Sequence, residues 1–382
     1  MSNPTVYDNE TLEALRDQVR RFVASEVVPH VEAWEAAGQV PREVLRRMGE
    51  LGFLGIRYPE RYGGSGLDTL ATVAFVEELS RSTCAGFNIT VLVHTDMASP
   101  HLARFGSPEQ LERYMADVVA GRAITAVAVT EPGGGSDVAA LKTRAERRGN
   151  GWRLNGSKTF ITNGALGDLY FVAARSDPQA KASRGISMFV VEKGTPGFSV
   201  ARKLDKMGWL ASDTAELAFE DCDLPADALL GEVDRGFYAI MKNFQNERIV
   251  LGAMGVGESR KAIEMTLEYV RQRQAFGGTL WDKQAVRQKL AALEGEVEAA
   301  RQLVWHAAWL DAQGRDAVKE VSMVKALCGE LVNRVMYACQ QFHGGYGYMR
   351  DYPIERMVRD ARIQSIGGGA TEVMLEEVAK RM

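Results

Sequence analysis

Cysteine is scarce in this sequence, and the four cysteines are scattered. Cys84, Cys222, Cys328 and Cys339 form no Cys-x-x-Cys pair, and none stands near a histidine at the spacing of metal ligands. This pattern argues against a disulfide scaffold and a structural zinc site. We therefore expect a protein of a reducing, cytoplasmic environment with no bound metal.

The sequence also lacks an excess of positive charge and any long apolar run. Its 46 Lys+Arg stand against 50 Asp+Glu, so the formal net charge is -4. Nucleic-acid binding is disfavoured, because it relies on basic residues that displace counterions from phosphates. Runs such as Ala123–Val129 are far shorter than the roughly 20 residues of a membrane span, and Met1–Glu10 lacks a signal-peptide pattern. We expect neither nucleic-acid binding nor membrane insertion.

The spacing of apolar residues changes character twice along the chain. In the first part they recur every three or four positions, as in Leu12–Val23, which is typical of amphipathic helices. Short β-branched and aromatic runs bounded by turn residues follow, such as Leu169–Ala174 and Ile186–Val191. Helical spacing returns from Gly236 onward. The chain therefore reads as helices, then strands, then helices.

This order predicts an α+β fold that is mostly α. We expect an N-terminal α-helical domain (1–121), a middle antiparallel β-barrel or sheet domain (122–233) and a C-terminal four-helix bundle (234–382). Within the middle part, Asn150-Gly151 and Asn155-Gly156 are hairpin signals. The order argues against a βαβ nucleotide fold, and neither a P-loop nor a G-x-G-x-x-G motif is present.

A glycine-rich segment, Thr130–Asp137 (Thr-Glu-Pro-Gly-Gly-Gly-Ser-Asp), directly follows a predicted strand. Three successive glycines can present backbone N–H groups to a ligand with no Cβ in the way. The hydroxyls of Thr130 and Ser136 can donate or accept hydrogen bonds. From these residues alone, a glycine turn without chemical purpose is equally compatible.

Four motifs together make the chain resemble the acyl-CoA dehydrogenases. They are Thr130–Asp137, Phe160–Gly164, Arg271–Gly277 and Gln341–Gly347, in the order found in that family, and the resemblance covers essentially the whole chain. It implies FAD bound between the middle sheet and the C-terminal helices, and α,β-dehydrogenation of an acyl-CoA thioester to the trans-2-enoyl-CoA, as in fatty acid β-oxidation. It also implies electron transfer to an electron-transfer flavoprotein and a homotetramer or homodimer.

The resemblance assigns residues to the cofactor and the substrate. Those it places at FAD are Val127, Val129, Thr130, Gly135, Ser136, Phe160, Thr162, Arg273, Phe276, Gln284, Gln341, Gly344, Gly345, Thr371 and Glu372. Those it places at the substrate are Ser136, Gln245, Arg248 and Gly369. In family terms Thr162 offers its hydroxyl to the flavin, and Arg273 meets the pyrophosphate of a neighbouring subunit's FAD, a task that suits a guanidinium fork.

The reaction needs a base for the α-proton and donors for the thioester carbonyl. Many relatives carry a catalytic glutamate in a C-terminal Tyr-Glu-Gly-Thr loop, where this chain has Gly367-Gly368-Gly369-Ala370. Glycine cannot take a proton. The long-chain and isovaleryl branches instead use a glutamate on a helix, and the matching residue is Glu247, within Gln245–Ile249. The resemblance thus implies Glu247 as the base and the backbone N–H of Gly368 as a donor.

Two alternatives for the base remain open at this stage. Glu247 could be a surface residue paired with Lys242 or Arg248, and Glu372 is a second candidate base. The function also has rivals: a dehydrogenase or oxidase of a carrier-protein-bound acyl or aminoacyl thioester, a monooxygenase, or a non-catalytic member that binds flavin or acyl-CoA. Gly367 replaces a tyrosine of relatives beside the substrate, so acyl length does not follow from the sequence. Ala370 replaces a threonine that helps hold FAD in relatives, so the grip of this loop on the cofactor is also left open.

Overall fold

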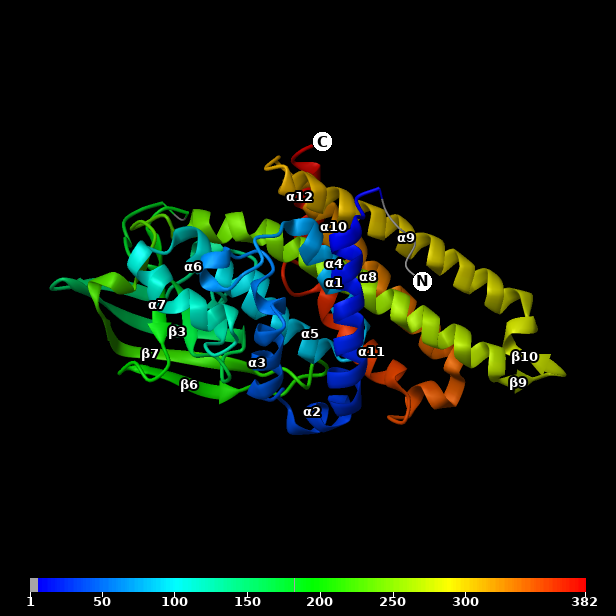
Figure 1. Cartoon of the computed structure of the whole chain (residues 1–382). Helices are drawn as coiled ribbons and strands as arrows, with labels where there is room; N and C mark the ends of the chain where they lie inside the picture. Colours follow the sequence, from blue (N-terminus) through cyan, green and yellow to red (C-terminus); the bar gives the residue numbers. More distant parts are fainter. Residues whose placement is uncertain (1–5, 182) are drawn as a thin grey trace.

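The structure is a computed structural model that describes residues 6–181 and 183–382. Its first part is helical (Figure 1). The helices are α1 (Glu10–Phe22), α2 (Val31–Ala37), α3 (Arg42–Glu50), α4 (Thr69–Leu79), α5 (Ala85–Leu92), α6 (Ser99–Phe105) and α7 (Pro108–Val119). A π-helical turn, η6 (Val93–Ala98), joins α5 to α6. α4 packs against α1, α8 and α9, which ties this part to the C-terminal helices.

The helix ends follow from the local sequence. Asn9 caps α1 by accepting a hydrogen bond from the backbone N–H of Leu12 at 2.9 Å. Ser107 and Gln110 form a capping box at the start of α7. Because α4 and α5 are buried on nearly every side, they lack the polar face that α1 presents to solvent.

The middle part is one eight-stranded sheet. Its strands are β1 (Thr125–Ala128), β2 (Arg144–Arg148), β3 (Gly151–Thr162), β4 (Leu169–Arg175), β5 (Ile186–Glu192), β6 (Phe198–Lys203), β7 (Thr214–Leu224) and β8 (Leu229–Leu230). The order is β6-β7-β3-β2-β4-β5-β8, with β1 paired to β4. Most neighbours are antiparallel, as expected, but β1 and β2 each run parallel to β4, which the sequence did not indicate.

One of the two hairpin signals was wrong. Asn150 lies in the tight turn between β2 and β3, as predicted. Asn155-Gly156 instead lies inside β3, where the pairing with β7 shifts register. A Cβ on Gly156 would come within 2.7 Å of the Thr143 hydroxyl oxygen. The glycine is needed there because the neighbouring backbone passes so close, and not because the chain turns.

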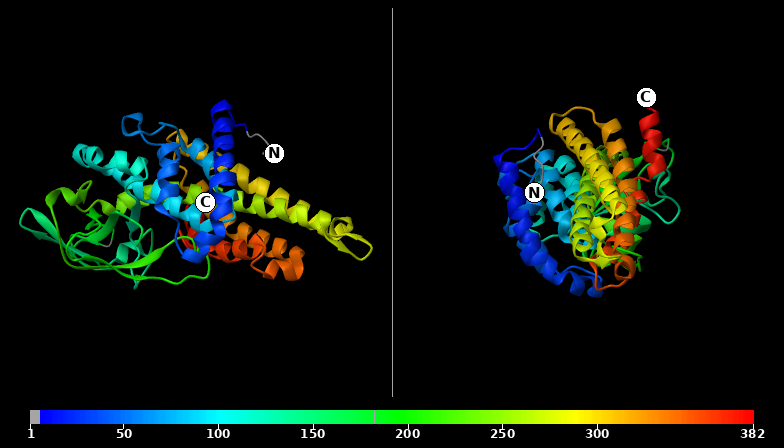
Figure 2. Two further views of the ribbon diagram at one scale, coloured as in Figure 1. Left: turned by 60° about the horizontal axis from the view of Figure 1, so that its bottom comes forward. Right: turned by 90° about the vertical axis from the view of Figure 1, so that its right-hand side faces the viewer.

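The C-terminal part is built on three long helices. The helices are α8 (Gly236–Gln272), α9 (Gln284–Ala312), α10 (Val318–His343), α11 (Pro353–Ala361) and α12 (Thr371–Ala379), with a small hairpin of β9 (Gln274–Ala275) and β10 (Gly278–Thr279) after α8. The long helices lie side by side in both views of Figure 2. α8 and α10 approach closely at Gly252, where a Cβ would lie 2.2 Å from Val324 Cγ1.

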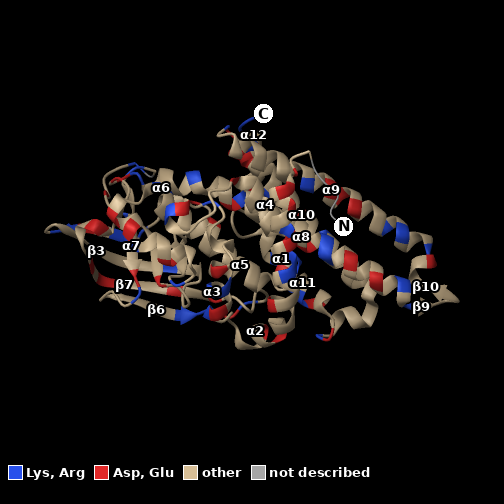
Figure 3. Ribbon diagram, viewed as in Figure 1, with Lys and Arg blue, Asp and Glu red and all other residues tan. Residues whose placement is uncertain are grey.

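The predicted fold class is confirmed: helices flank a middle sheet, and the C-terminal helices form a bundle. The predicted limits 121/122 and 233/234 fall in the α7–β1 and β8–α8 connections, and as domain limits they stay predictions. Figure 3 shows acidic and basic residues interspersed along the helices and strands. In the described part of the chain, no helix is both long and apolar enough to cross a membrane.

Candidate active site

The carboxyl of Glu247 lies beside the glycine loop that precedes α12. Glu247 is half-buried on α8. A Cβ placed on Gly368 would lie 3.4 Å from Glu247 Oε1 and 2.3 Å from Leu251 Cδ1. Gly368 also has a φ of +65°, a conformation that favours glycine. The loop backbone therefore runs so close to Glu247 and Leu251 that the fold has room for a glycine there and no side chain.

The surroundings of Glu247 suit proton transfer. Desolvation by burial raises the pKa of its carboxyl to about 7, while the Arg248 and Lys325 cations act in the opposite direction. A base with a pKa near the working pH can take a proton and release it again. Lys242 is exposed, and among the described residues no hydrogen bond joins Glu247 to Lys242 or to Arg248, which acts on the carboxyl through its charge alone. The geometry thus disfavours the surface-pair alternative.

Two asparagines hold α8 in place next to Glu247. Asn243 donates to the carbonyl oxygen of Met97 at 2.9 Å, and Asn246 donates to that of Asp96 at 2.7 Å. Both acceptors lie in the π-helical turn η6, where the wider turn alters the backbone hydrogen bonding of an α-helix. The asparagines compensate for this, and in doing so they fix the position of α8 one residue from the candidate base.

The glycine-rich segment is anchored to β3 at its start. The carbonyl oxygen of Thr130 accepts from the backbone N–H of Thr159 at 3.0 Å. The fully buried Lys158 donates to the carbonyl oxygen of Val129 at 3.0 Å and to Glu131 Oε1 at 2.8 Å. A buried ion pair of this kind is costly unless its geometry is well satisfied, as it is here.

The rest of that segment is open. The Glu131 carboxylate also accepts from the backbone N–H groups of Lys142 and Thr143, at 2.6 and 2.8 Å, so it holds both ends of the intervening loop. Between these anchors, a Cβ on Gly133 or Gly134 would meet no atom within 4 Å. The predicted glycine surface is therefore present, with its ends fixed and its backbone accessible.

Phe160 is an unusual residue for a strand. Its side chain is 69% exposed and its φ is +59°, a left-handed conformation rarely adopted by aromatic residues. It lies where the β3–β7 register shifts, two residues before the half-buried Thr162. Strained backbone at an exposed apolar side chain is characteristic of functional sites.

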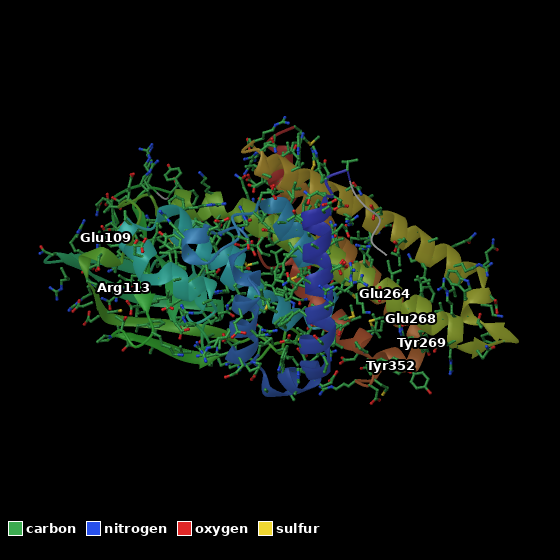
Figure 4. The ribbon with its side chains drawn as sticks, viewed as in Figure 1. Glu109, Arg113, Glu264, Glu268, Tyr269 and Tyr352 are labelled. Carbon is green, nitrogen blue, oxygen red and sulfur yellow. The ribbon has the colours of Figure 1, made fainter. Side chains whose placement is uncertain are left out.

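A pocket of about 440 Å³ lies at the far end of α8, beside the β9–β10 hairpin. It is lined by Tyr269, Arg273, Leu280, Phe342, His343, Gly344, Gly345, Tyr346 and Met349. Figure 4 labels Tyr269 and Tyr352 at this end; their rings meet edge to face with centroids 6.0 Å apart, and Tyr269 stacks on His343 at 4.4 Å. The Arg273 guanidinium carbon lies 5.6 Å from the Tyr346 ring centroid.

The predicted site residues thus fall into separate groups. Val127, Val129, Thr130, Gly135, Ser136, Phe160 and Thr162 lie on the sheet side, whereas Gln245, Glu247, Arg248, Gly368 and Gly369 lie at α8 and the glycine loop. Arg273, Phe276, Gln284, Gln341, Gly344 and Gly345 lie at the far end. The stretch of α8 from Glu247 to Gln272 is about 38 Å long at a rise of roughly 1.5 Å per residue. The far group therefore does not face the same place as the other two.

Thr371 and Glu372 begin α12. The Thr371 hydroxyl donates to Glu330 Oε1 at 2.8 Å, and the Glu372 side chain is exposed.

Sequence reasoning missed three charged residues that shape these groups. They are Glu131 and Lys158, described above, and Lys325, which is buried on α10 under the glycine loop. A signal existed for Lys325, because it continues the apolar stripe of Val321 and Val324, where a charge is unexpected. A charged residue on the buried face of a helix is worth singling out.

Comparison with known proteins places these features in context. Models of the acyl-CoA dehydrogenase N-terminal, middle and C-terminal domains match residues 9–122, 126–222 and 234–382. The chain is 44% identical over 368 residues to the mitochondrial long-chain specific acyl-CoA dehydrogenase of Mus musculus, covering 96% of this chain and 85% of that protein. It is 37% identical to the mitochondrial isovaleryl-CoA dehydrogenase of Pongo abelii, covering 96% and 87%.

Two solved structures also superpose on essentially the whole chain. The acyl-CoA dehydrogenase from Geobacillus kaustophilus superposes with a TM-score of 0.95 at 40% identity, covering 99% of both chains. The FAD complex of PigA superposes with a TM-score of 0.95 at 26% identity, covering 100% of this chain and 99% of that one.

Proposed function

The chain belongs to the acyl-CoA dehydrogenase family as a FAD-dependent oxidoreductase, and from this premise we propose that Glu247 is the base of its reaction. The observation that carries this proposal is the position of the Glu247 carboxyl, 3.4 Å from where a Gly368 Cβ would lie. Its pKa of about 7 is suited to removing an α-proton near neutral pH.

The residues present fit a flavin dinucleotide. Gly133 and Gly134 offer open backbone, and Phe160 offers an exposed apolar face next to Thr162. When bound, FAD supplies the acceptor for the hydride that leaves the β-carbon. We assign Val127, Val129, Thr130, Gly135, Ser136, Phe160 and Thr162 to this half of the cofactor site.

The chain's own groups carry the remaining work on the thioester. The backbone N–H of Gly368 donates to the thioester carbonyl oxygen, which stabilises the negative charge that develops there. The Glu247 carboxylate then takes the α-proton, and the product is the trans-2-enoyl-CoA. Gln245, Arg248, Gly369 and Ser136 line the substrate in this proposal.

The far pocket serves a neighbouring subunit. Within one chain, about 38 Å of helix separates Arg273 from Glu247. The two residues of a single chain therefore cannot contact the same FAD. The exposed apolar side chains at this end, Phe276 at 94% and Tyr348 at 81%, support contact with a second copy. Arg273, Phe276, Gln284, Gln341, Gly344 and Gly345 then bind the adenine half of the partner's FAD. We propose a homo-oligomer, a tetramer or a dimer.

Two further assignments complete the proposal. An electron-transfer flavoprotein accepts the electrons, as the family resemblance implies, and the enzyme works in the cytoplasm, in keeping with its buried, unbridged cysteines. Acyl length and branching are left open.

The test compares two glutamates. Anaerobic addition of an acyl-CoA series should bleach the oxidised flavin of the wild-type enzyme. Glu247→Gln should slow that bleaching by about 10³-fold, because a general base contributes roughly 10²–10⁴ in rate, while acyl-CoA binding is retained. Glu372→Gln changes the second candidate base, and the fraction of this variant that holds FAD should bleach at the wild-type rate. Loss of bleaching in the Glu372 variant instead would mean that Glu247 is the wrong base.

A further inference from the structure

A buried lysine lies directly under the loop that carries Gly368. Lys325, on α10, is 2% exposed. Its ammonium donates to the carbonyl oxygen of Gln364 at 2.5 Å and to that of Gly369 at 2.9 Å. These two carbonyls stand on either side of Gly368, so one side chain ties both ends of the short segment whose N–H faces the thioester in the proposed function.

Lys325 and Glu247 approach the same glycine. A Cβ placed on Gly368 would lie 3.7 Å from Lys325 Cε and 3.4 Å from Glu247 Oε1. The loop backbone is thus held next to the lysine stem and next to the carboxyl at once. A displacement of the loop away from α10 would change the distance between the Gly368 N–H and the Glu247 carboxyl.

The same loop has a second anchor on α8. The side-chain amide of Gln364 donates to Glu258 Oε2 at 2.6 Å, in a fully buried setting. Burial raises the pKa of Glu258 well above its usual value, which favours the uncharged form of this carboxyl. Gln364 is therefore fixed to α8 through its side-chain amide. It is fixed to α10 through its carbonyl oxygen, which accepts from the Lys325 ammonium.

The charge of Lys325 also acts on the base. The charged or titratable groups that face Lys325 are Glu247 and Arg248 from α8, and Cys328 and Glu330 from α10. Glu247 is influenced by Arg248 and Lys325, and both cations lower the pKa of its carboxyl against the effect of burial. A nearby cation in a desolvated site favours the charged form of an acid.

We propose that Lys325 is a positioning residue for the reaction: its two hydrogen bonds fix the Gly368 N–H relative to the Glu247 carboxyl, and its side chain lies against the same glycine as that carboxyl. This inference rests on the proposed function of Glu247. It adds a residue that touches neither the flavin nor the thioester and acts through two groups that touch the substrate.

The test removes the ammonium and keeps the stem. Lys325→Met should slow anaerobic flavin bleaching at pH 7 by about 100-fold, since small misplacements of reacting groups cost up to roughly 10²-fold. The midpoint of the pH profile for bleaching should move to higher pH, because a cation near Glu247 is gone. Amide hydrogen exchange in residues 362–374 should become faster, because the loop has lost two hydrogen bonds. Lys319→Met, on the same helix, is the matched control and should match the wild type in all three measurements.

A second variant distinguishes the effect of the hydrogen bonds to the loop from the effect of the charge, and it provides a test if the first variant misfolds. Lys325→Gln keeps an uncharged donor near the loop, so it should lose less rate than the methionine variant but show the same upward midpoint. If the methionine variant is insoluble, the glutamine variant carries the test alone. A wild-type midpoint in the tested variant, with or without a loss of rate, would overturn the proposal, because a purely structural lysine leaves the midpoint unchanged.

Failure of this inference is distinguishable from failure of the proposed function. If Glu247→Gln abolishes bleaching while Lys325→Met behaves as the wild type, only the role of Lys325 is wrong. If Glu247→Gln bleaches at the wild-type rate, the base itself is misassigned, and the role of Lys325 falls with it.

Discussion

The two ends of α8 differ in how many of the contacts around them come from the same chain. At the end near the sheet, Glu247 is half-buried and lies against a loop that Lys325 and Glu258 hold from two helices. At the far end, Arg273 is exposed, Phe276 is almost wholly in solvent, and the pocket beside them opens outward. At one end the loop is held by hydrogen bonds within the chain, and at the other end Arg273 and Phe276 are exposed.

Under the proposed function, this difference separates the groups that move the proton from the groups that retain the cofactor. Groups that move protons must hold fixed distances, so a single rigid chain is the safest way to position them. Groups that grip the adenine half of a dinucleotide only need to be present when subunits meet. Substitutions at the two ends should therefore fail in different assays, and the three predictions that follow test this.

The largest effect is expected at the inner end. Gly368→Ala places a Cβ 2.3 Å from Leu251 Cδ1 and requires a φ of +65°, so the loop must move away from Glu247. Flavin bleaching by acyl-CoA should slow by about 100-fold with FAD still bound. Gly295→Ala, in the exposed part of α9 where a Cβ meets nothing, is the control and should leave the rate unchanged. Loss of FAD in the Gly368 variant would contradict the separation of proton transfer at the inner end from cofactor retention at the outer end.

An intermediate effect is expected at the outer end. Arg273→Gln removes a charged hydrogen-bond donor worth roughly 1.5–3 kcal/mol, so FAD should bind about 10- to 100-fold more weakly. The fraction of enzyme that still holds FAD should bleach within about twofold of the wild-type rate, since Glu247 is remote. Arg334→Gln, which breaks an exposed ion pair with Glu296, is the control for FAD titration. Slow bleaching in the FAD-loaded Arg273 variant would mean that the outer end also affects proton transfer, and it would contradict the division of roles between the two ends.

The smallest effect is a change of pH. Because the pKa of Glu247 is raised to about 7, its carboxylate form grows as pH rises through neutrality. Bleaching at pH 6 should therefore be about tenfold slower than at pH 8. FAD affinity should hardly change over that window, because an arginine keeps its charge. A flat rate profile would mean that a group other than Glu247 takes the proton.

The fold was predictable from the sequence because its signals are local. Apolar residues at helical spacing became α1, α8, α9 and α10, and short β-branched runs became β4 and β5. The parallel pairing of β1 with β4 was not predictable, since it joins segments whose register depends on the packed sheet. Asn155-Gly156 was misread because an Asn-Gly pair in a bulge looks the same as one in a turn.

The site was predictable in part, and for a similar reason. The glycine loop and Glu247 were identified from motifs that resemble a family, and their roles stay predictions. Lys325 carries no motif of its own, because its acceptors are backbone carbonyls 39 and 44 residues further along the chain. Any residue type leaves a carbonyl there, so only the folded backbone reveals the contact.

The Glu131–Lys158 ion pair has a consequence for how the enzyme is assembled. Contacts within the chain hold the pair in place: Lys158 donates to the carbonyl oxygen of Val129, and the Glu131 carboxylate accepts from the N–H groups of Lys142 and Thr143. We therefore expect both ends of the glycine segment to keep their positions when the flavin is removed. Apoprotein stripped of its flavin should consequently recover its colour at the speed of diffusion and docking, with no slow refolding phase at this loop.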